Sequence, residues 1–193
     1  MNTLTYIRAK YNLKENQSQH KLHRSRVGSL SVLFKELGFN RGAEIGIETG
    51  QYSKCLLTVN PYLKLFAIDT KVELDNAYYN KAKNRLAPFN ARIYKDTSMD
   101  AVKRFKNGSL DFVYINTFGD SKDAFDDIKE WSKKVRKGGI VAGYNYSNKS
   151  QWGQRLGLKK VVDKWVNNNK IRPLIVFDKN DTPTWFYVKE KSA

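Results

Sequence analysis

Residues 44–50 read Glu44-Ile45-Gly46-Ile47-Glu48-Thr49-Gly50, an apolar strand-like run that breaks into a loop bracketed by two glycines. Glycine permits a sharp turn and lets backbone N–H groups come close to a ligand. Asp69 follows 19 residues after Gly50, at the end of a second apolar run. A carboxylate at that place can accept hydrogen bonds from both hydroxyls of a ribose. The loop and the acid together predict a nucleoside pocket in a βαβ unit.

The spacing of the glycines separates this loop from a dinucleotide fingerprint. A dinucleotide site arranges three glycines as G-x-G-x-x-G, so that a pyrophosphate sits on the N-terminus of the following helix. Here three residues separate Gly46 from Gly50, and no third glycine opens the next helix. We therefore expect a ligand that contains a ribose and lacks a pyrophosphate.

The composition indicates one globular domain. The chain has 193 residues with four Trp, ten Phe and eleven Tyr, which is enough for one substantial core and too few for two ordinary domains. No apolar run is long enough to span a bilayer, and the first ten residues do not resemble a signal peptide. We expect a cytoplasmic protein with no membrane partner. The single Cys55 lies in an apolar helical stripe, which favours a buried thiol over a disulfide or a nucleophile.

The charge has two interpretations. The chain carries 35 basic and 19 acidic residues, a net charge of +16, and a basic protein of this kind can bind nucleic acid. Lysine outnumbers arginine and asparagine is abundant, however, which is typical of a composition bias. The basic residues are spread along the chain, with a modest concentration at residues 8–26. Nucleic acid is therefore a second, less favoured partner class, because net charge informs about partners and not about fold.

From Gly42 onward, strand-like segments alternate with helical patterns. Short β-branched or aromatic runs bounded by turn residues predict strands at 43–47, 63–69, 91–94, 110–116 and 140–144. Amphipathic stripes between them predict helices, and further stripes at 30–37 and 158–165 predict covering helices. Strands that are apolar on both faces are typical of a parallel sheet covered by helices on both sides.

The C-terminal part predicts a hairpin. Strands at 174–177 and 184–188 are joined by six residues, too few for a parallel crossover, so we expect them to pair antiparallel. The predicted fold is thus α/β, with a seven-stranded sheet of five parallel strands plus this hairpin. Residues 1–28 are polar and basic without a clear period. We expect them to form a frayed arm or a flap over the pocket.

Four short motifs stand in a distinctive order, at residues 44–53, 68–69, 96–98 and 137–146. Their order resembles that of class I S-adenosylmethionine-dependent methyltransferases. Within that superfamily the chain is similar to small bacterial and viral enzymes with the motifs E-I-G-x-x-x-G-x-x-S, I-D, G-x-S, I-D-x-x-H and P-G-G-x-x-x-G-H-D-Y. The resemblance covers about residues 41–146. It implies a Rossmann-like fold, with a single methyltransferase domain at 29–193.

The resemblance also implies S-adenosylmethionine as the cofactor and assigns residues to it. Gly46 and Gly50 would bring the loop against the methionine half, and Asp69 would hold the ribose. The cofactor-binding residues implied in this way are Glu44, Gly46, Gly50, Tyr52, Ser53, Asp69, Asp96, Thr97, Ser98 and Asn116. Their clusters follow predicted strands, at the carboxyl ends where open α/β sheets bind ligands.

The chain departs from the family pattern at the reacting centre. Asn116 stands where the family strand ends in Asp, and Gly119 replaces the downstream His. Tyr144 and Asn145 replace the His and Asp of the last motif. Mg²⁺ needs oxygen ligands that also compensate its charge, so we expect no bound metal and a metal-independent transfer. The lost histidine also removes the obvious general base.

Three residues are candidates for catalysis. Asn116 would face the reacting centre at the end of the fourth strand. Asp120 would be a replacement base, although an Asp between Gly and Ser is also a common helix N-cap. Tyr144, together with Tyr146, would line the acceptor pocket or form part of its aromatic rim.

Three functions follow from these observations. The favoured one is a methyltransferase for a small acceptor that is anionic or hydroxylated, with positioning as the main catalytic device. The second is a nucleic-acid methyltransferase, although residues 116–119 do not match the N-P-P-Y pattern that holds a flipped base. The third is a cofactor-binding protein that has lost catalysis, because the Asp and the His are replaced.

Overall fold

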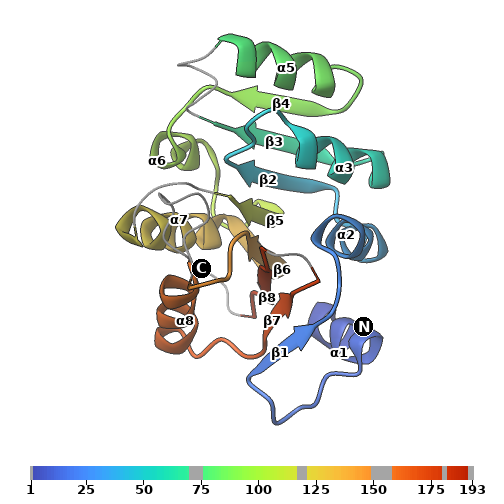
Figure 1. The fold of residues 1–193 in the computed structure, drawn as a ribbon, viewed down its shortest axis with the longest axis vertical. Coiled ribbons are helices and arrows are strands. Elements are labelled where there is room, and N and C mark those ends of the chain that lie inside the picture. The colour runs from blue at the N-terminus through green and yellow to red at the C-terminus, as the bar shows by residue number, and fades with distance from the viewer. Residues whose placement is uncertain (1, 70–75, 117–120, 149–157, 180–181, 191–193) are drawn as a thin grey trace.

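The computed structural model describes residues 2–69, 76–116, 121–148, 158–179 and 182–190 (Figure 1). Its strands are β1 (Gln19–Leu22), β2 (Arg41–Ile45), β3 (Lys64–Ile68), β4 (Ala91–Tyr94), β5 (Leu110–Ile115), β6 (Val135–Gly143), β7 (Leu174–Phe177) and β8 (Thr184–Val188). Its helices are α1 (Thr3–Tyr11), the π-helix η1 (Arg26–Leu30), α2 (Ser31–Glu36), α3 (Gln51–Val59), α5 (Asn76–Leu86), α6 (Ser98–Ala101), the 3₁₀ helix η2 (Val102–Arg104), α7 (Ser121–Lys134) and α8 (Lys159–Asn168).

The strands form one sheet in the order β1-β7-β8-β6-β5-β2-β3-β4. Strands β4, β3, β2, β5 and β6 are parallel neighbours, and β8 runs antiparallel to both β6 and β7. This arrangement confirms the predicted Rossmann-like sheet of five parallel strands with a C-terminal antiparallel hairpin. The chain builds β3 and β4 on one side of β2, and β5 and β6 on the other. The topological switch point, where such sheets bind ligands, therefore lies between β2 and β5.

The sheet has eight strands instead of the seven expected, because β1 adds to its edge. Gln19 pairs with Leu174 in a parallel ladder with β7. The sequence did not predict this strand because its four residues are mostly polar and only His20 is buried. Its extended conformation depends on the backbone of β7 and not on an apolar pattern of its own. The N-terminal segment, expected as a frayed arm or a flap, thus contributes one helix and one strand.

Helices cover both faces of the sheet (Figure 1). Side chains of α1, α2, α3 and α5 pack on one face, and those of α6, α7 and α8 pack on the other. Successive residues of β5 alternate between the two cores, with Phe112 in one and Val113 in the other, both fully buried. Burying a side chain such as Phe112 contributes about 1.5–3 kcal/mol. The two cores hold the carboxyl ends of β2, β3 and β5 at fixed relative positions.

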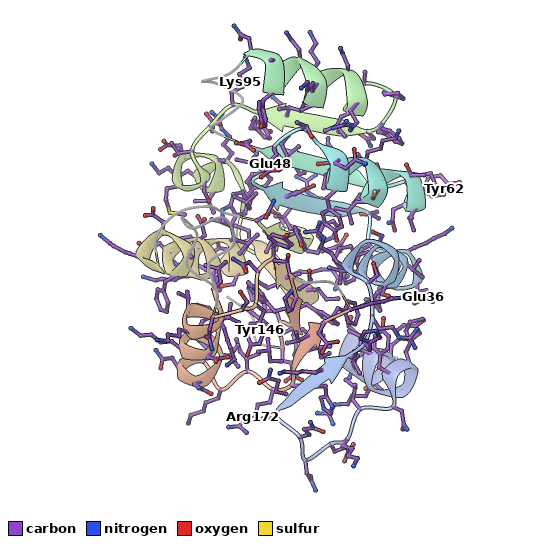
Figure 2. All side chains as sticks on the ribbon, viewed as in Figure 1. Glu36, Glu48, Tyr62, Lys95, Tyr146 and Arg172 are labelled. Carbon is purple, nitrogen blue, oxygen red and sulfur yellow. The ribbon has the colours of Figure 1, made fainter. Side chains whose placement is uncertain are left out.

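Three further observations concern the helices and the surface. Among the helices of the described ranges, none is both long enough and apolar enough to cross a membrane. Cys55 on α3 is half-buried, where the sequence predicted a buried thiol, and its thiol is free. Tyr62, which projects from the loop after α3, is 89% exposed (Figure 2).

Candidate active site

The loop after β2 makes a tight turn that requires its glycines. Gly46 has φ +81° and Gly50 has φ +73°, both in the left-handed region that glycine adopts without strain. Glu48 also has a positive φ, of +52°. The Gly46 N–H donates a hydrogen bond to the carbonyl of Ile68 at 2.8 Å, which fastens the loop to the end of β3. The loop is therefore held at the switch point of the sheet, where the sequence predicted a ligand.

Asp69 is the acidic residue that the structure brings to this loop. Its Oδ2 accepts a hydrogen bond from the backbone N–H of Glu48 at 2.6 Å, and the residue is 6% exposed. Its own N–H donates to the carbonyl of Tyr94 at 3.2 Å, so it lies across the ends of β3 and β4. A carboxylate has about four acceptor positions, so the bond that fastens the loop takes up only part of what this group can accept.

Glu44 and Ser53 lie beneath the loop. Ser53 Oγ donates to Glu44 Oε2 at 2.6 Å, and the two residues are 0% and 1% exposed, respectively. Burial raises the pKa of Glu44 to about 8, and the Ser53 hydrogen bond and the charge of Arg26 only partly oppose that rise. The pair therefore joins β2 to the first turn of α3 from inside the core.

Asn116 connects β5 to the same loop. Its backbone N–H donates to the carbonyl of Ile45 at 2.8 Å, and its Nδ2 donates to the carbonyl of Gly46 at 2.9 Å. Its Oδ1 is buried and has no hydrogen-bond partner among the described residues. A buried acceptor without a partner costs about 1–3 kcal/mol, which indicates that this oxygen is suited to a donor from a ligand.

Tyr144 and Tyr146 point to different parts of the molecule. The Tyr144 N–H donates to the carbonyl of Ile115 at 2.9 Å, which places Tyr144 beside the end of β5. Tyr146 is 4% exposed, and its hydroxyl donates to the carboxylate of Asp163 on α8. Burial and that carboxylate both raise the pKa of Tyr146. Tyr146 is thus part of the packing of α8, and Tyr144 is the tyrosine that stays at the candidate site.

The residues after β4 are engaged in local structure. Asp96 Oδ2 pairs with Arg104 Nε at 2.8 Å, and Thr97 caps α6 by accepting the N–H of Asp100 at 3.1 Å. Ser98 Oγ accepts from Trp131 Nε1 at 2.8 Å, which turns it toward α7. The structure brings Asp96 to the same edge of the sheet as Asp69 through the Asp69 bond to Tyr94, but it directs Ser98 into the helical layer. Asp120 lies outside the described residues.

Arg26 is the residue of this region that the sequence analysis missed. Its guanidinium carbon lies 5.0 Å from the ring centroid of Tyr52 and 4.5 Å from that of Tyr144. Its Nη1 donates to the hydroxyl of Tyr114 at 3.4 Å. In the sequence Arg26 is only one of several basic residues at 8–26. It reaches this site because β1 docks on β7. No local motif marks Arg26, because the tyrosines that surround it in the fold lie far from it in the sequence.

The metal-ligating side chains are dispersed in the part of the chain that the structure describes. There, no three His, Cys, Asp or Glu residues gather closely enough to hold a metal ion. Asn145, which replaces a family carboxylate, is 7% exposed, and its Oδ1 accepts from Ser147 Oγ at 2.9 Å. The predicted absence of a metal therefore stays a prediction, which rests on Asn116 and Asn145.

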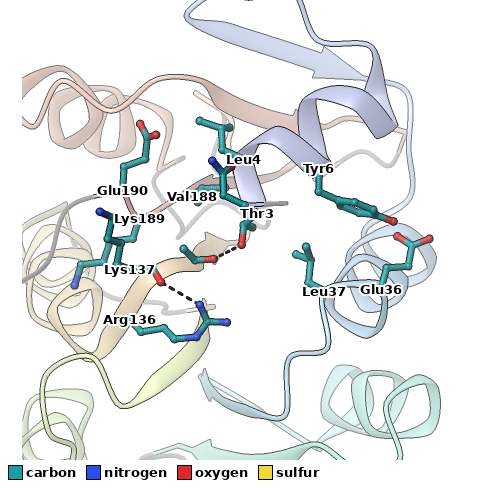
Figure 3. Close-up of a pocket in the computed structure, with 12 residues that line it drawn as sticks. Thr3, Leu4, Tyr6, Glu36, Leu37, Arg136, Lys137, Val188, Lys189 and Glu190 are labelled. Atoms are coloured by element: carbon teal, nitrogen blue, oxygen red, sulfur yellow. Dashed lines mark hydrogen bonds between the residues drawn. The ribbon is translucent and has the colours of Figure 1, made fainter.

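A separate pocket of about 740 Å³ lies at the opposite, amino-terminal end of β6 (Figure 3). Thr3 Oγ1 donates there to the carbonyl of Gly138 at 2.6 Å, and Arg136 Nη1 donates to the carbonyl of Lys137 at 3.0 Å. None of the residues predicted for the site lines this pocket. Two of its charged residues form ion pairs: Arg136 with Asp111 at 2.7 Å and Glu36 with Lys10 at 2.7 Å. The pocket thus lies where α1 packs against the sheet.

Comparisons with known proteins agree with this geometry. A family model described as a methyltransferase domain matches residues 43–146, which contain the β2 loop, Asp69, Asn116 and Tyr144. No curated protein matches the chain with significance.

Solved structures of low identity share the fold. An O-methyltransferase family protein from Burkholderia thailandensis is 12% identical with a TM-score of 0.68; the match covers 86% of this chain and 56% of that one. An rRNA methylase from Streptococcus thermophilus is 12% identical with a TM-score of 0.66, covering 88% and 99%. The O-methyltransferase TomG from Streptomyces achromogenes, solved in complex with SAM, is 17% identical with a TM-score of 0.64, covering 97% and 89%. The chain thus spans little more than half of the Burkholderia protein.

Proposed function

The chain belongs to the methyltransferase domain family, and from this premise we propose that it transfers the methyl group of S-adenosylmethionine to a small acceptor that is anionic or hydroxylated. One observation carries the proposal. The glycine loop after β2, the carboxylate of Asp69 and the amide of Asn116 are joined by hydrogen bonds at the switch point of the sheet. The TomG structure in complex with SAM supports the choice of cofactor, because it has the same fold.

The residues present fit this cofactor. Asp69 would accept hydrogen bonds from the ribose hydroxyls, and the first N–H groups of α3 would face the methionine half. The buried Oδ1 of Asn116, which lacks a partner among the residues described, is an acceptor of the kind that an ammonium group needs. When bound, the cofactor supplies an electrophilic methyl group on its sulfonium. Glu44, Tyr52 and Ser53 would support the loop from the protein side.

The chain's own contribution to the reaction would be positioning. Asn116 and Tyr144 stand at the ends of neighbouring strands β5 and β6, so an acceptor held between them would have a fixed orientation. A hydroxyl acceptor must also lose a proton as the methyl group arrives. The phenol of Tyr144 and the carboxyl of Asp120 are our candidates for handling that proton. Asp96 and Thr97 would border the adenine, whereas the hydroxyl of Ser98 is turned toward Trp131 on α7.

Binding calorimetry tests this function. The protein should bind S-adenosylhomocysteine in preference to NAD, since the loop lacks the third glycine of a pyrophosphate site. Asp69→Ala should weaken that binding by about 1–3 kcal/mol, the range for a lost charged acceptor. Glu15→Ala is the matched control, because the Glu15 side chain is 87% exposed. NAD binding that equals or exceeds that of S-adenosylhomocysteine would overturn the proposal.

A second candidate acceptor is nucleic acid, and one observation favours it. Four cations lie over two aromatic rings on one face of the sheet: Arg41 and Lys64 lie over Phe66 at 4.7 and 5.7 Å, and Arg92 and Arg104 lie over Tyr94 at 5.0 and 5.5 Å. The sequence suggested that the basic residues are dispersed, whereas the fold gathers these four. Phosphates bind to gathered cations of this kind. Phe66 itself is only 4% exposed and cannot stack on a base, and Arg104 is already paired with Asp96.

A further inference from the structure

We propose that Arg26 forms a preformed binding site for a carboxylate at the active site. The inference rests on the proposed function and adds a residue and a ligand chemistry to it. The carboxylate would belong either to the methionine half of the cofactor or to the acceptor, and both sources share the same chemistry.

The geometry around Arg26 holds the guanidinium in place and leaves it without an anion. Its central carbon lies over the rings of Tyr52 and Tyr144, at 5.0 and 4.5 Å from their centroids. One of its five N–H donors contacts the hydroxyl of Tyr114 at 3.4 Å. No carboxylate of the described chain forms an ion pair with it, although the side chain is half-buried. The remaining donors are therefore oriented before a ligand arrives.

The tyrosines around Arg26 stabilise its charge, but no ionised carboxylate of the described residues pairs with it. Glu44 is the acid whose titration responds to Arg26, and burial raises its pKa to about 8. At neutral pH most of the Glu44 population is therefore protonated and uncharged. A partly desolvated cation without a counter-ion is unfavourable, and a carboxylate that forms two parallel hydrogen bonds with a guanidinium relieves this cost.

Arg26 also lies where the ligands of a methyltransferase would meet. Tyr52 is in the first turn of α3, directly after the glycine loop. Tyr144 is bonded to the carbonyl of Ile115, next to Asn116. A carboxylate held by Arg26 would thus lie between the loop that faces the cofactor and the strand ends that face the acceptor.

Backbone hydrogen bonds bring Arg26 to this place. The N–H of Asp178 donates to the carbonyl of Leu22 at 3.1 Å, and the N–H of Lys179 donates to the carbonyl of Arg24 at 3.3 Å. These bonds fasten the segment between β1 and η1 to the end of β7. An alternative role for Arg26 is purely structural, as a lock that holds η1 against Tyr52 and Tyr144.

Calorimetry on the full chain separates these roles. The variants are Arg26→Gln, which removes the charge, and Arg26→Lys, which keeps the charge but loses the planar pair of donors. Arg24→Gln is the matched control, because Arg24 is exposed. Each protein is titrated with S-adenosylhomocysteine and with 5′-methylthioadenosine, which lacks the amino and carboxylate groups. In a second arm, benzoate is titrated into protein saturated with S-adenosylhomocysteine.

We expect Arg26→Gln to weaken S-adenosylhomocysteine about 10- to 100-fold and to leave 5′-methylthioadenosine unchanged. Arg26→Lys should lie between Arg26→Gln and the wild type. That pattern assigns the carboxylate to the cofactor. If S-adenosylhomocysteine is unaffected but benzoate binding is lost in Arg26→Gln, the proposal holds with the acceptor as the source.

Two results would overturn the proposal. Equal weakening of both nucleosides in Arg26→Gln would show that Arg26 is a structural lock, and unchanged binding of all three probes would show that it holds no carboxylate. The failure of the proposed function gives a different pattern, because the wild-type protein would then bind neither nucleoside. That result would remove the basis of this inference as well.

Discussion

Glu44 should make the protein less stable as the pH rises through neutrality. Its side chain is 1% exposed, and burial raises its pKa from the ordinary value of 4.5 to about 8. Between these two values the folded protein keeps a proton that the unfolded chain releases. Since the folded state then binds more protons, the free energy of unfolding falls as the pH increases from about 4.5 to about 8.

The size of the effect follows from the shift in pKa. Each unit corresponds to about 1.36 kcal/mol, so the loss relative to acidic pH is roughly 3 kcal/mol at pH 7 and roughly 5 kcal/mol above pH 8. Glu44→Gln removes the titration, while its amide oxygen can still accept the hydrogen bond that Ser53 now donates at 2.6 Å. The stability of the variant relative to the wild type should therefore increase with pH by these amounts.

Urea unfolding of the ligand-free protein, from about pH 5 to about pH 8, measures this difference. Glu15→Gln serves as the control, since the Glu15 side chain is 87% exposed and should follow the wild type at every pH. Parallel pH profiles of Glu44→Gln and the wild type would refute the reasoning, because Glu44 would then titrate as in the unfolded chain.

Three other outcomes are expected. Gly143→Ala should lower the free energy of unfolding by about 1–3 kcal/mol in thermal melts, because the new Cβ would lie 2.5 Å from the Trp185 ring. Gly28→Ala, with no atom within 4 Å, should not lower it. Methyl transfer should survive EDTA, because neither Asn116 nor Asn145 offsets the charge of a cation; a large loss that Mg²⁺ restores would contradict this. Oligonucleotide binding across a salt series should be weak and should collapse as salt rises; submicromolar, sequence-dependent affinity at physiological salt would favour the nucleic-acid acceptor.

The parallel core could be predicted because its signals are local. Continuous apolar runs and amphipathic stripes placed β2, β3, β4 and β5 within two residues of their observed bounds. Strand β6 starts at Val135, before the predicted residue 140, because Arg136, Lys137, Gly138 and Gly139 do not read as a strand in isolation. Its extension depends on pairing with β5, where Leu110 faces Val135 across a shift in register.

The candidate site likewise contains residues that local motifs predict and residues that depend on distant parts of the chain. The positive φ of Gly46 and Gly50 and the position of Asp69 after β3 follow from motifs whose meaning lies in a few neighbouring residues. The orientation of Ser98 depends on a hydrogen bond from Trp131, a residue on another helix. Arg26 depends on contacts with three separate elements. Such residues could not be assigned, because one sequence does not reveal which distant segments meet.

The pairing of β1 with β7 has a consequence for how the protein is made. Gln19 leaves the ribosome early, but Leu174, its partner, is synthesised near the end. At 5–20 residues per second, β7 is synthesised roughly 8 to 30 seconds after β1. The five parallel strands are complete before that time, so the nascent chain can fold its centre while the N-terminal segment is still undocked. Arg26 therefore reaches Tyr52 and Tyr144 only after translation of β7, and ribosome-bound chains that stop before β7 should carry the glycine loop without the guanidinium beside it.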